Sequence, residues 1–522
     1  MALKVGGTTV VDDSRQLTNI ASVDATTVAA LGAAGVGGGG GVFDMTATGA
    51  ISSGDLVALN TDGTVTTISE TDSDANPPTN GNETSGFASA GSKFDTSYDT
   101  ANDKLVCAYT QAGDAKVFPA TVSGAKGSET VTIGSDLALL FKSTNEGPQI
   151  VYDSVGGKHI VAWSHYNSDS DDGCHAVVVD ASGSSLTKGT QYDWLANLRS
   201  DQFSMCYDAD NQNIYISYQS DGGGTYIKAG SISGDTITFG SAVTLDSTKR
   251  NTACVYDPDT NQIIVLMDGS SQTRCLLFTV SGTTLTLQTE SSSNRLKHGG
   301  TDLSINHKFM MYEPHNNKIL VSYSTGGNEV FVIAGTVTSN SVSWGTQFSV
   351  ESSITVDNVS ARGTKMTLRG DNTGKFVLAY DKGNNTIVVQ TMTLSGTTLT
   401  KTVSSPRNRT STQNGDVLFN PDKEHALFFT RLNTSNNIRV GLIQLTETST
   451  NNSHFIGIAG EAIADGSSGE IKMLGSVDNQ QSGLTPRTVY YAQPDGSLGT
   501  SNTDVKVGTA VTSSAILITR PD

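Results

Sequence analysis

The sequence predicts an all-β protein whose main body is a β-propeller of seven blades, with six blades as the alternative. Three observations predict this fold. A hairpin pattern recurs about every fifty residues, a second hairpin follows it in most repeats, and separate β-rich segments stand at the two ends of the chain. Repeats of this length with four strands each are typical of propeller blades around a central axis.

The leading hairpin is clearest in residues 254–267, where two apolar strands flank a turn of Asp, Pro, Thr and Asn. Such turn residues supply the backbone angles and local hydrogen bonds that a tight hairpin needs. Seven copies align on an anchor in the first strand: Tyr98, Tyr152, Tyr207, Tyr256, Tyr312, Arg369 and Phe419. The anchors are 54, 55, 49, 56, 57 and 50 residues apart, and this nearly constant period predicts a repeat fold.

Large side chains also recur within the hairpins. Eleven positions after the anchors stand Tyr109, Trp163, Tyr218, Met267, Tyr323, Tyr380 and, in the seventh copy, Thr430. We expect these residues to pack between neighbouring repeats, with an aromatic ligand platform as the alternative. The turn carboxylates Asp208, Asp210, Asp257 and Asp259 are expected to accept local hydrogen bonds rather than to catalyse a reaction.

The second hairpin carries a Ser-Gly turn in five of the repeats, for example at 233–234 and 281–282. The seventh repeat lacks this turn and is therefore one strand short. A closed ring needs that strand, so we expect it to come from the segment before the first blade, with residues 64–68 or the stretch near Phe87 as candidates.

The domain organisation follows from changes in composition along the chain. Five consecutive glycines at 37–41 have no side chains to pack and predict a flexible joint. The predicted parts are an N-terminal segment 1–36, the joint 37–41, a β segment 42–70, a polar linker 71–92, the propeller 93–452 and a second β segment 453–522.

Composition excludes several classes of protein. Charged residues make up 16% of the 522 residues and the net charge is −18, so we expect no binding to nucleic acid or to anionic membranes. The five cysteines show no CxxC spacing and predict neither a zinc site nor a disulfide framework. No secretory signal and no apolar run long enough to cross a membrane is present, which predicts synthesis in a cytoplasm without membrane insertion.

Both ends of the chain resemble proteins of tailed bacteriophages. Residues 3–20 resemble the start of tail-fibre and related virion proteins. Residues 54–65 and residues 455–466 with 482–498 resemble the two parts of one β module of phage structural proteins. In those relatives the two parts are adjacent in sequence, so the resemblance implies that the propeller is inserted into a small β domain built from both flanks.

This resemblance implies a location and partners. The protein would be part of a virion, made in the host cytoplasm, and residues 1–36 would attach it to the phage tail or to other virion proteins. Fibre proteins of this kind are often homotrimers, so association with copies of itself is expected.

The expected function is that of a tail fibre or spike whose propeller binds a host-surface glycan or protein. Aromatic residues in propeller loops could stack on sugars, and the candidates are Tyr166, Tyr192, Trp194 and Trp344. The alternatives are a propeller glycosidase or depolymerase that acts on host envelope polysaccharide, and a fibre or decoration protein attached to the capsid.

Catalytic and metal motifs are scarce. The sequence has no GxSxG, HExxH or Walker loop and no Asp-box turn of the sialidase type, so no enzymatic activity is expected. An acidic loop with Asp169, Asp171 and Asp172 offers oxygen ligands suited to Ca²⁺, and a solvated loop tip is the alternative. No other cofactor is indicated.

Overall fold

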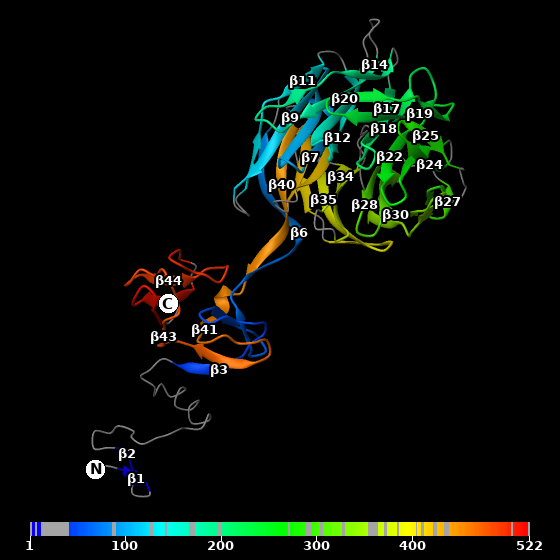
Figure 1. The fold of residues 1–522 in the computed structure, drawn as a ribbon. Helices are drawn as coiled ribbons and strands as arrows, with labels where there is room; N and C mark the ends of the chain where they lie inside the picture. Colours follow the sequence, from blue (N-terminus) through cyan, green and yellow to red (C-terminus); the bar gives the residue numbers. More distant parts are fainter. Residues whose placement is uncertain are drawn as a thin grey trace. The chain divides into compact units, whose positions relative to one another are not determined.

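A computed structural model of the chain describes its residues in the following ranges: 3–5, 8–11, 41–85, 90–124, 129–140, 144–165, 173–196, 200–269, 272–288, 294–302, 306–325, 329–352, 364–369, 373–383, 386–402, 405–408, 412–420, 425–432, 438–502 and 505–519. The chain divides into two compact units (Figure 1). One comprises Met1–Ser73 and Glu447–Asp522, and the other is Asp74–Thr446.

The larger unit is a seven-bladed β-propeller, and the predicted all-β class is confirmed. The first blade contains β7 (Ala90–Asp99), β8 (Lys104–Gln111), β9 (Asp114–Ser123), β10 (Thr130–Ile133) and β11 (Leu137–Leu140). The second contains β12 (Thr144–Asp153), β13 (Lys158–His165), β14 (Gly173–Asp180), β15 (Thr187–Lys188) and β16 (Tyr192–Ala196). The third contains β17 (Ser200–Asp208), β18 (Asn213–Ser220), β19 (Thr225–Ser233), β20 (Thr236–Phe239) and β21 (Val243–Asp246).

The remaining blades follow the same order. The fourth contains β22 (Thr252–Asp257), β23 (Gln262–Asp268), β24 (Thr273–Ser281) and β25 (Thr284–Leu287), followed by a small hairpin of β26 (Lys297–His298) and β27 (Thr301–Asp302). The fifth contains β28 (Asn306–Glu313), β29 (Lys318–Thr325), β30 (Glu329–Val337), β31 (Val342–Trp344) and β32 (Phe348–Glu351). The sixth contains β33 (Thr364–Leu368), β34 (Lys375–Gly383), β35 (Thr386–Ser395), β36 (Thr398–Lys401) and β37 (Ser405–Asn408).

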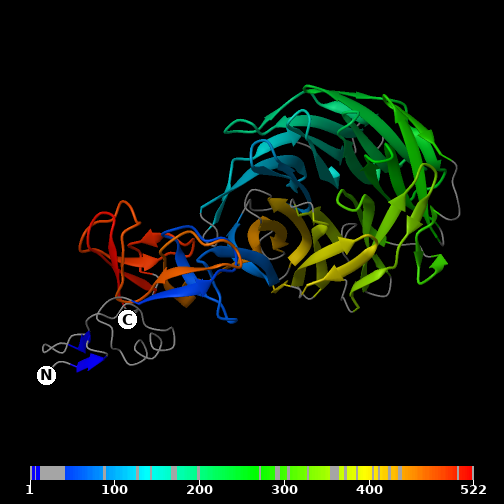
Figure 2. The same cartoon turned by 60° about the horizontal axis from the view of Figure 1, so that its bottom comes forward.

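The seventh blade closes the ring with a strand from elsewhere in the chain. Its sheet runs β38 (Thr412–Asn420), β39 (His425–Leu432), β40 (Ile438–Thr450) and then β6 (Glu70–Ser85), which precedes the first blade in sequence. The first strand of each blade contacts that of the next, and β38 contacts β7 (Figure 2). The ring is therefore closed.

The source of the closing strand corrects two predictions. Residues 71–92 were expected to form a linker, but β6 occupies most of that range. Residues 64–68 are not the closing strand, because β5 (Val65–Thr67) lies in a sheet of the other unit, and Phe87 lies outside the described residues. The polar composition of 70–85 hid the strand. A strand at the outer edge of a blade is held mainly by backbone hydrogen bonds to its neighbour. It therefore does not need the alternating apolar side chains by which strands are recognised in a sequence.

The hairpin turns explain the anchor pattern. In six of the seven blades the anchor pairs with the residue seven positions later in the second strand, for example Tyr98 with Leu105 and Tyr312 with Ile319. In the sixth blade the residue in this position is Leu368, which pairs with Phe376, so the choice of Arg369 was wrong by one position. That turn is one residue longer than the others, which shifted the alignment.

The small unit contains two sheets. One has the strand order β3 (Val42–Thr46), β42 (Ser468–Lys472), β41 (Phe455–Ala459), β4 (Leu56–Leu59) and β5. The other has the order β43 (Val477–Asp478), β47 (Ile516–Ile518), β46 (Lys506–Ala510), β44 (Val489–Ala492) and β45 (Leu498–Gly499). The first sheet thus joins residues from both flanks of the propeller. A 3₁₀ turn, η2 (Asn452–His454), precedes β41, and β1 (Leu3–Val5) pairs with β2 (Thr8–Val11) as a separate hairpin.

The propeller core lies between neighbouring blades. The large residues that follow the anchors, from Tyr109 to Tyr380, are all buried in clusters that join two blades. Tyr109, for instance, packs against Phe118 of its own blade and belongs to a cluster with Leu427 and Phe429 of the seventh. The packing interpretation is confirmed, and the alternative of an aromatic ligand platform at these positions is wrong.

Candidate functional site

A hollow lies at the centre of the ring. It has a volume of about 420 Å³, and every one of the seven innermost strands contributes residues to its wall. This volume is within the range of sites that hold small ligands. Runs of neighbouring residues line the hollow, for example 94–98 of β7 and 202–207 of β17.

One repeat position lines the hollow in six of the blades. It stands three residues before the aligned anchor, and the residues there are Asp95, Gln149, Ser204, Ala253, Phe309 and Lys365 in blades one to six. The anchors of these repeats are mostly Tyr, whereas this position differs in every blade. The blades are therefore alike in construction, while the hollow that they enclose is chemically asymmetric.

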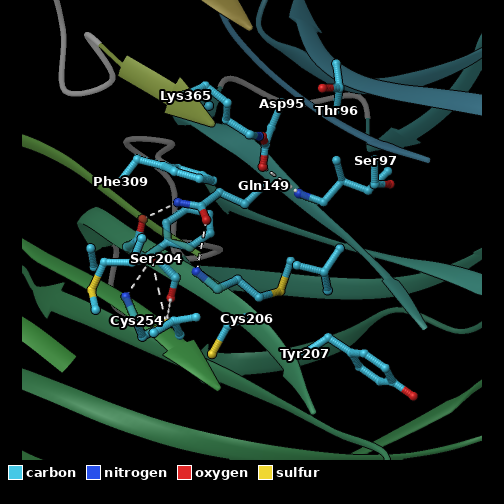
Figure 3. Close-up of a pocket in the computed structure, with 18 of the residues that line it drawn as sticks. Asp95, Thr96, Ser97, Gln149, Ser204, Cys206, Tyr207, Cys254, Phe309 and Lys365 are labelled. Atoms are coloured by element: carbon cyan, nitrogen blue, oxygen red, sulfur yellow. Dashed lines mark hydrogen bonds and ion pairs between the residues drawn. The ribbon is translucent and has the colours of Figure 1, made fainter. Parts of the chain in front are cut away.

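The two charges at this position form a pair. Lys365 Nζ contacts Asp95 Oδ1, so blade six is linked to blade one across the hollow (Figure 3). Asp95 also accepts the backbone N–H of Ile150 over 3.0 Å, and Lys365 Nζ lies 5.4 Å from the centre of the Phe309 ring. Both charged side chains keep a small exposed fraction, 11% for Asp95 and 16% for Lys365, so they can meet a ligand that enters the hollow.

Two neutral polar side chains bridge neighbouring blades. The amide of Gln149 accepts the N–H of Met205 over 2.9 Å and donates to the carbonyl of Phe203. Ser204 Oγ accepts the N–H of Cys254 over 3.2 Å. These contacts fix the inner edges of blades two, three and four, and they leave a polar rim beside the apolar parts of the wall.

A second lysine of the wall is deeply buried. Lys308 Nζ contacts Asp268 Oδ1, and only 2% of the Lys308 side chain is exposed. Desolvation lowers the pKa of Lys308, and the nearby Asp268 carboxylate opposes that shift. Because the pair is enclosed, it stabilises the junction of blades four and five and offers little to a ligand.

A Ser, a His and an Asp, the residue types of many hydrolase triads, meet between blades one and two. Ser97 Oγ lies 2.7 Å from His159 Nδ1, and His159 Nε2 lies 4.0 Å from Asp99 Oδ2. The separation from Asp99 is too long for a hydrogen bond, and all three residues are buried. Burial lowers the pKa of His159 to about 4 against the opposing effect of the Asp99 and Asp180 carboxylates. This cluster is a packed contact between blades one and two. It could not be predicted from the sequence, because His159 is about sixty positions away from Ser97 and Asp99.

The turn carboxylates have the expected structural role. Asp208 accepts the N–H of Asn211 over 3.0 Å, and Asp257 accepts that of Asp259 over 3.0 Å. Asp210 accepts the hydroxyl of Tyr256 from the next blade over 2.6 Å. These acids are engaged in building turns and blade junctions.

The predicted ligand aromatics are not brought together. Trp194 lies in β16 and is fully buried, with its indole N–H donating to the carbonyl of His175 over 2.9 Å. The interpretation of Trp194 as a loop residue that meets a ligand is therefore wrong, because it packs against Phe203 and Tyr218.

The other predicted site residues fall into two groups. Tyr192 is half-buried in the same strand, β16, and Trp344 is half-buried in β31 of blade five, where it lines a second hollow. Tyr166 and the acidic residues Asp169, Asp171 and Asp172 lie outside the described residues.

The described parts of the chain show neither a metal cluster nor a membrane-spanning helix. Among those residues, no group of three or more His, Cys, Asp or Glu side chains could hold a metal ion. None of the helices found there is long and apolar enough to cross a membrane.

Comparisons with known proteins give information on the fold only. No protein-family model matches the sequence, and no curated protein matches it. One similar solved structure is AofleA from Arthrobotrys oligospora, with 10% identity, a TM-score of 0.38, and coverage of 67% of this chain and 94% of that one. Trypanosoma rangeli sialidase has 10% identity, a TM-score of 0.39, and coverage of 59% and 56%. The Dos1 propeller has 10% identity, a TM-score of 0.41, and coverage of 70% and 94%. At these identities and scores the similarities assign no ligand or activity, and the chain is placed among β-propellers by its own sheets.

Proposed function

We propose that the chain is a structural protein of a tailed-phage virion, a tail fibre or spike, and that its propeller binds a host-surface glycan or protein. The observation that carries the binding role is the hollow at the centre of the ring, which is large enough for one or two sugar residues and is lined by different chemistry from each blade. The resemblance of both chain ends to phage fibre proteins supports the virion role.

The division of the chain supports a display function. Both flanks of the propeller contribute strands to one sheet of the small unit, and the propeller occupies the sequence between them. Insertion of this kind lets a binding domain be carried by an anchoring domain without a free end. We propose that residues 1–36 attach the protein to the tail or to other virion proteins and that the protein associates with itself as a homotrimer.

We propose that the propeller binds its ligand without cleaving it. Glycoside hydrolases usually use two carboxylates that flank the scissile bond. Among the described residues that line the hollow, Asp95 is the sole carboxylate, and it is paired with Lys365. The ion pair with Lys365 engages the Asp95 carboxylate, which supports a binding role for this residue.

Imaging of whole particles tests the proposal. Purified virions would be labelled with antibody raised against residues 93–450 and viewed by electron microscopy. Label at the tail tip is the expected result, and label over the capsid would instead indicate a decoration protein. Particles without label would contradict the virion role.

Two further measurements separate the remaining alternatives. If the purified protein releases reducing sugar from host envelope polysaccharide, the proposal of binding alone is contradicted and the alternative of a depolymerase is supported. Light scattering on the full chain tests the trimer, and a monomeric mass would contradict it.

A further inference from the structure

The innermost strands of blades one, two, three and five share an irregularity beside the central hollow. In each of them the pairing with the second strand shifts in register a few residues after the strand begins. The shift ends at Phe94, Gln149, Phe203 and Phe309, and all four residues line the hollow. A β-bulge bends its strand and turns side chains in new directions, and bulges are frequent beside functional sites. The same local device therefore shapes the wall of the hollow in four blades.

A hydrogen-bond donor and an acceptor stand side by side in this wall. Lys365 Nζ contacts Asp95 Oδ1, and the other carboxylate oxygen accepts the N–H of Ile150 over 3.0 Å. Part of each charged side chain stays exposed, and both line the hollow. An ammonium group has three N–H donors and a carboxylate has about four lone-pair sites, so an ion pair can also bind a polar ligand. Two adjacent hydroxyl groups match it, because one can accept from the ammonium while the other donates to the carboxylate.

An aromatic ring lies beside the ion pair. The centre of the Phe309 ring is 5.4 Å from Lys365 Nζ (Figure 3). Phe309 is half-buried and packs against the core cluster of blades five and six that contains Met366 and Tyr380. It also lines the hollow. A ring held in this way offers a flat apolar surface against which the C–H face of a sugar ring can pack.

The charges found in the wall are balanced. Among the described residues that line the hollow, the charged ones are Asp95, Lys308 and Lys365. Asp95 is paired with Lys365, and Lys308 is enclosed with Asp268. A charged ligand would bring an uncompensated charge into this enclosed space, which costs free energy. The net charge of −18 further disfavours an anion, so the hollow favours a neutral polar ligand.

The ring of strands also restricts how a ligand enters. The innermost strands of all seven blades line the hollow, and each contacts the next around the ring. A ligand therefore enters along the axis of the ring and not from the side. The end of a glycan chain fits such a path, and the volume of about 420 Å³ limits the bound part to one or two sugar residues.

We propose that the central hollow binds the terminal residue of a neutral glycan through two adjacent ring hydroxyls. Lys365 donates to one hydroxyl oxygen, the other hydroxyl donates to Asp95, and the sugar ring packs on Phe309. The inference rests on the proposed function, because it names the class of host-surface ligand that the propeller takes and the residues that hold it.

Ligand-detected NMR titrations with the full-length protein test this site. The probes are the methyl glycosides of D-glucose, D-galactose, D-mannose, L-rhamnose and N-acetyl-D-glucosamine. Each is compared with its 3-deoxy form, which keeps the ring but has no two adjacent ring hydroxyls. At least one glycoside is expected to bind with a Kd on the order of millimolar and its 3-deoxy form about tenfold more weakly, as the loss of one charge-assisted hydrogen bond predicts. No binding of any glycoside, or equal affinity of every bound glycoside and its 3-deoxy form, would overturn the proposal.

Acidic sugars test the preference for a neutral ligand. The 6-carboxylate forms of the glucose, galactose and mannose glycosides are expected to bind no more tightly than the neutral forms. Tighter binding of the acidic forms would contradict a neutral ligand.

Substitutions locate the binding. Asp95→Asn with Lys365→Met in one chain removes both charged groups without stranding either charge, and is expected to lower affinity at least about tenfold. Phe309→Leu keeps an apolar side chain against the core and tests the site independently of the ion pair, with an expected loss of about fivefold. The matched control is Asp221→Asn with Lys249→Met, which removes an ion pair of blade three outside the hollow. The control should bind as the wild type does, and wild-type affinity in either hollow variant would contradict the site.

The result can be separated from that for the proposed function. Virions that carry the label at the tail tip while the protein binds no methyl glycoside would overturn the inference alone. Unlabelled virions together with glycoside binding that the hollow variants weaken would support the inference and contradict the virion role.

Discussion

The hydroxyl of Tyr152 donates a hydrogen bond to Asp99 Oδ1 over 2.8 Å, and this bond joins the second blade to the turn of the first. The same carboxylate oxygen accepts the backbone N–H groups of Ala101 and Asn102 over 3.0 Å each. One acid therefore shapes its own hairpin and also holds the next blade. Tyr207 repeats the arrangement by donating to Asp153.

The Tyr152 bond predicts a measurable loss of stability. Desolvation and the hydrogen bond to Asp99 raise the pKa of Tyr152, which marks the hydroxyl as a firmly held donor. Tyr152→Phe is expected to lower the free energy of unfolding by about 1.5–3 kcal/mol, the range for a hydrogen bond to a charged group. Denaturant unfolding followed by tryptophan fluorescence measures it. Tyr192→Phe is the control, since no hydrogen bond of its hydroxyl is found among the described residues, and an equal loss in both variants would contradict the prediction.

Buried His159 predicts that the protein becomes less stable in weak acid. Its pKa is about 4 in the folded chain and about 6.5 when unfolded, because burial disfavours the charged ring more than Asp99 and Asp180 favour it. Below pH 6.5 the unfolded chain binds a proton that the folded chain does not, so stability falls as pH falls toward 4. We expect a loss of about 2–3 kcal/mol between pH 7.5 and 4.5 from this group.

The matched variant isolates this contribution. His159→Gln cannot titrate, so its unfolding free energy should fall less steeply over the same pH range than that of the wild type. Urea unfolding at several pH values measures both slopes. Identical slopes in the two proteins would show that His159 is not the group responsible.

The ion pair of Asp95 and Lys365 predicts that the stability effects of substituting both residues do not add. Lys365→Met leaves the largely buried Asp95 without its counter-charge and is expected to cost about 3 kcal/mol of unfolding free energy. Asp95→Asn in the same chain removes the stranded charge while its side-chain oxygen still accepts the N–H of Ile150. The double variant should therefore be more stable than Lys365→Met alone. A double variant that is less stable by the sum of both single changes would rule out the pairing.

The closing strand predicts how short the propeller can be made. A chain of residues 74–446 keeps most of β6 beside β40, whereas a chain of residues 86–446 leaves the β40 edge unpaired. We expect the longer chain to unfold cooperatively and the shorter one to aggregate, because an exposed strand edge pairs with other chains. Size-exclusion chromatography and thermal unfolding compare the two. A monomeric, equally stable 86–446 chain would contradict the role of β6.

Much of the fold could be predicted because the hairpin is a local structure that is repeated. The turn acids, the apolar strands on each side of them and the period near fifty residues are all visible in single stretches of sequence. The slip from Leu368 to Arg369 came from one extra turn residue, which only the strand register reveals. The β6 strand was missed because it is polar and pairs with a strand more than 350 residues away.

The candidate sites could be predicted less well. Aromatic residue type suggested both Trp194 and Trp344, but only the packing distinguishes a buried core tryptophan from one that lines a hollow. Asp95 and Lys365 stand 270 positions apart and meet because the ring closes. Nothing local in the sequence marks either residue as part of a pair.

The all-β class could be predicted from residue patterns alone, as could the repeated hairpins and the large inner residues that pack between blades. These properties depend on turn chemistry and on the alternation of side chains, which act over a few residues. The tertiary structure alone decided which strand closes the ring, which residues face the central hollow and how Phe309 comes to lie beside Lys365. Those properties depend on the closure of the ring, which brings together residues that are far apart in the chain.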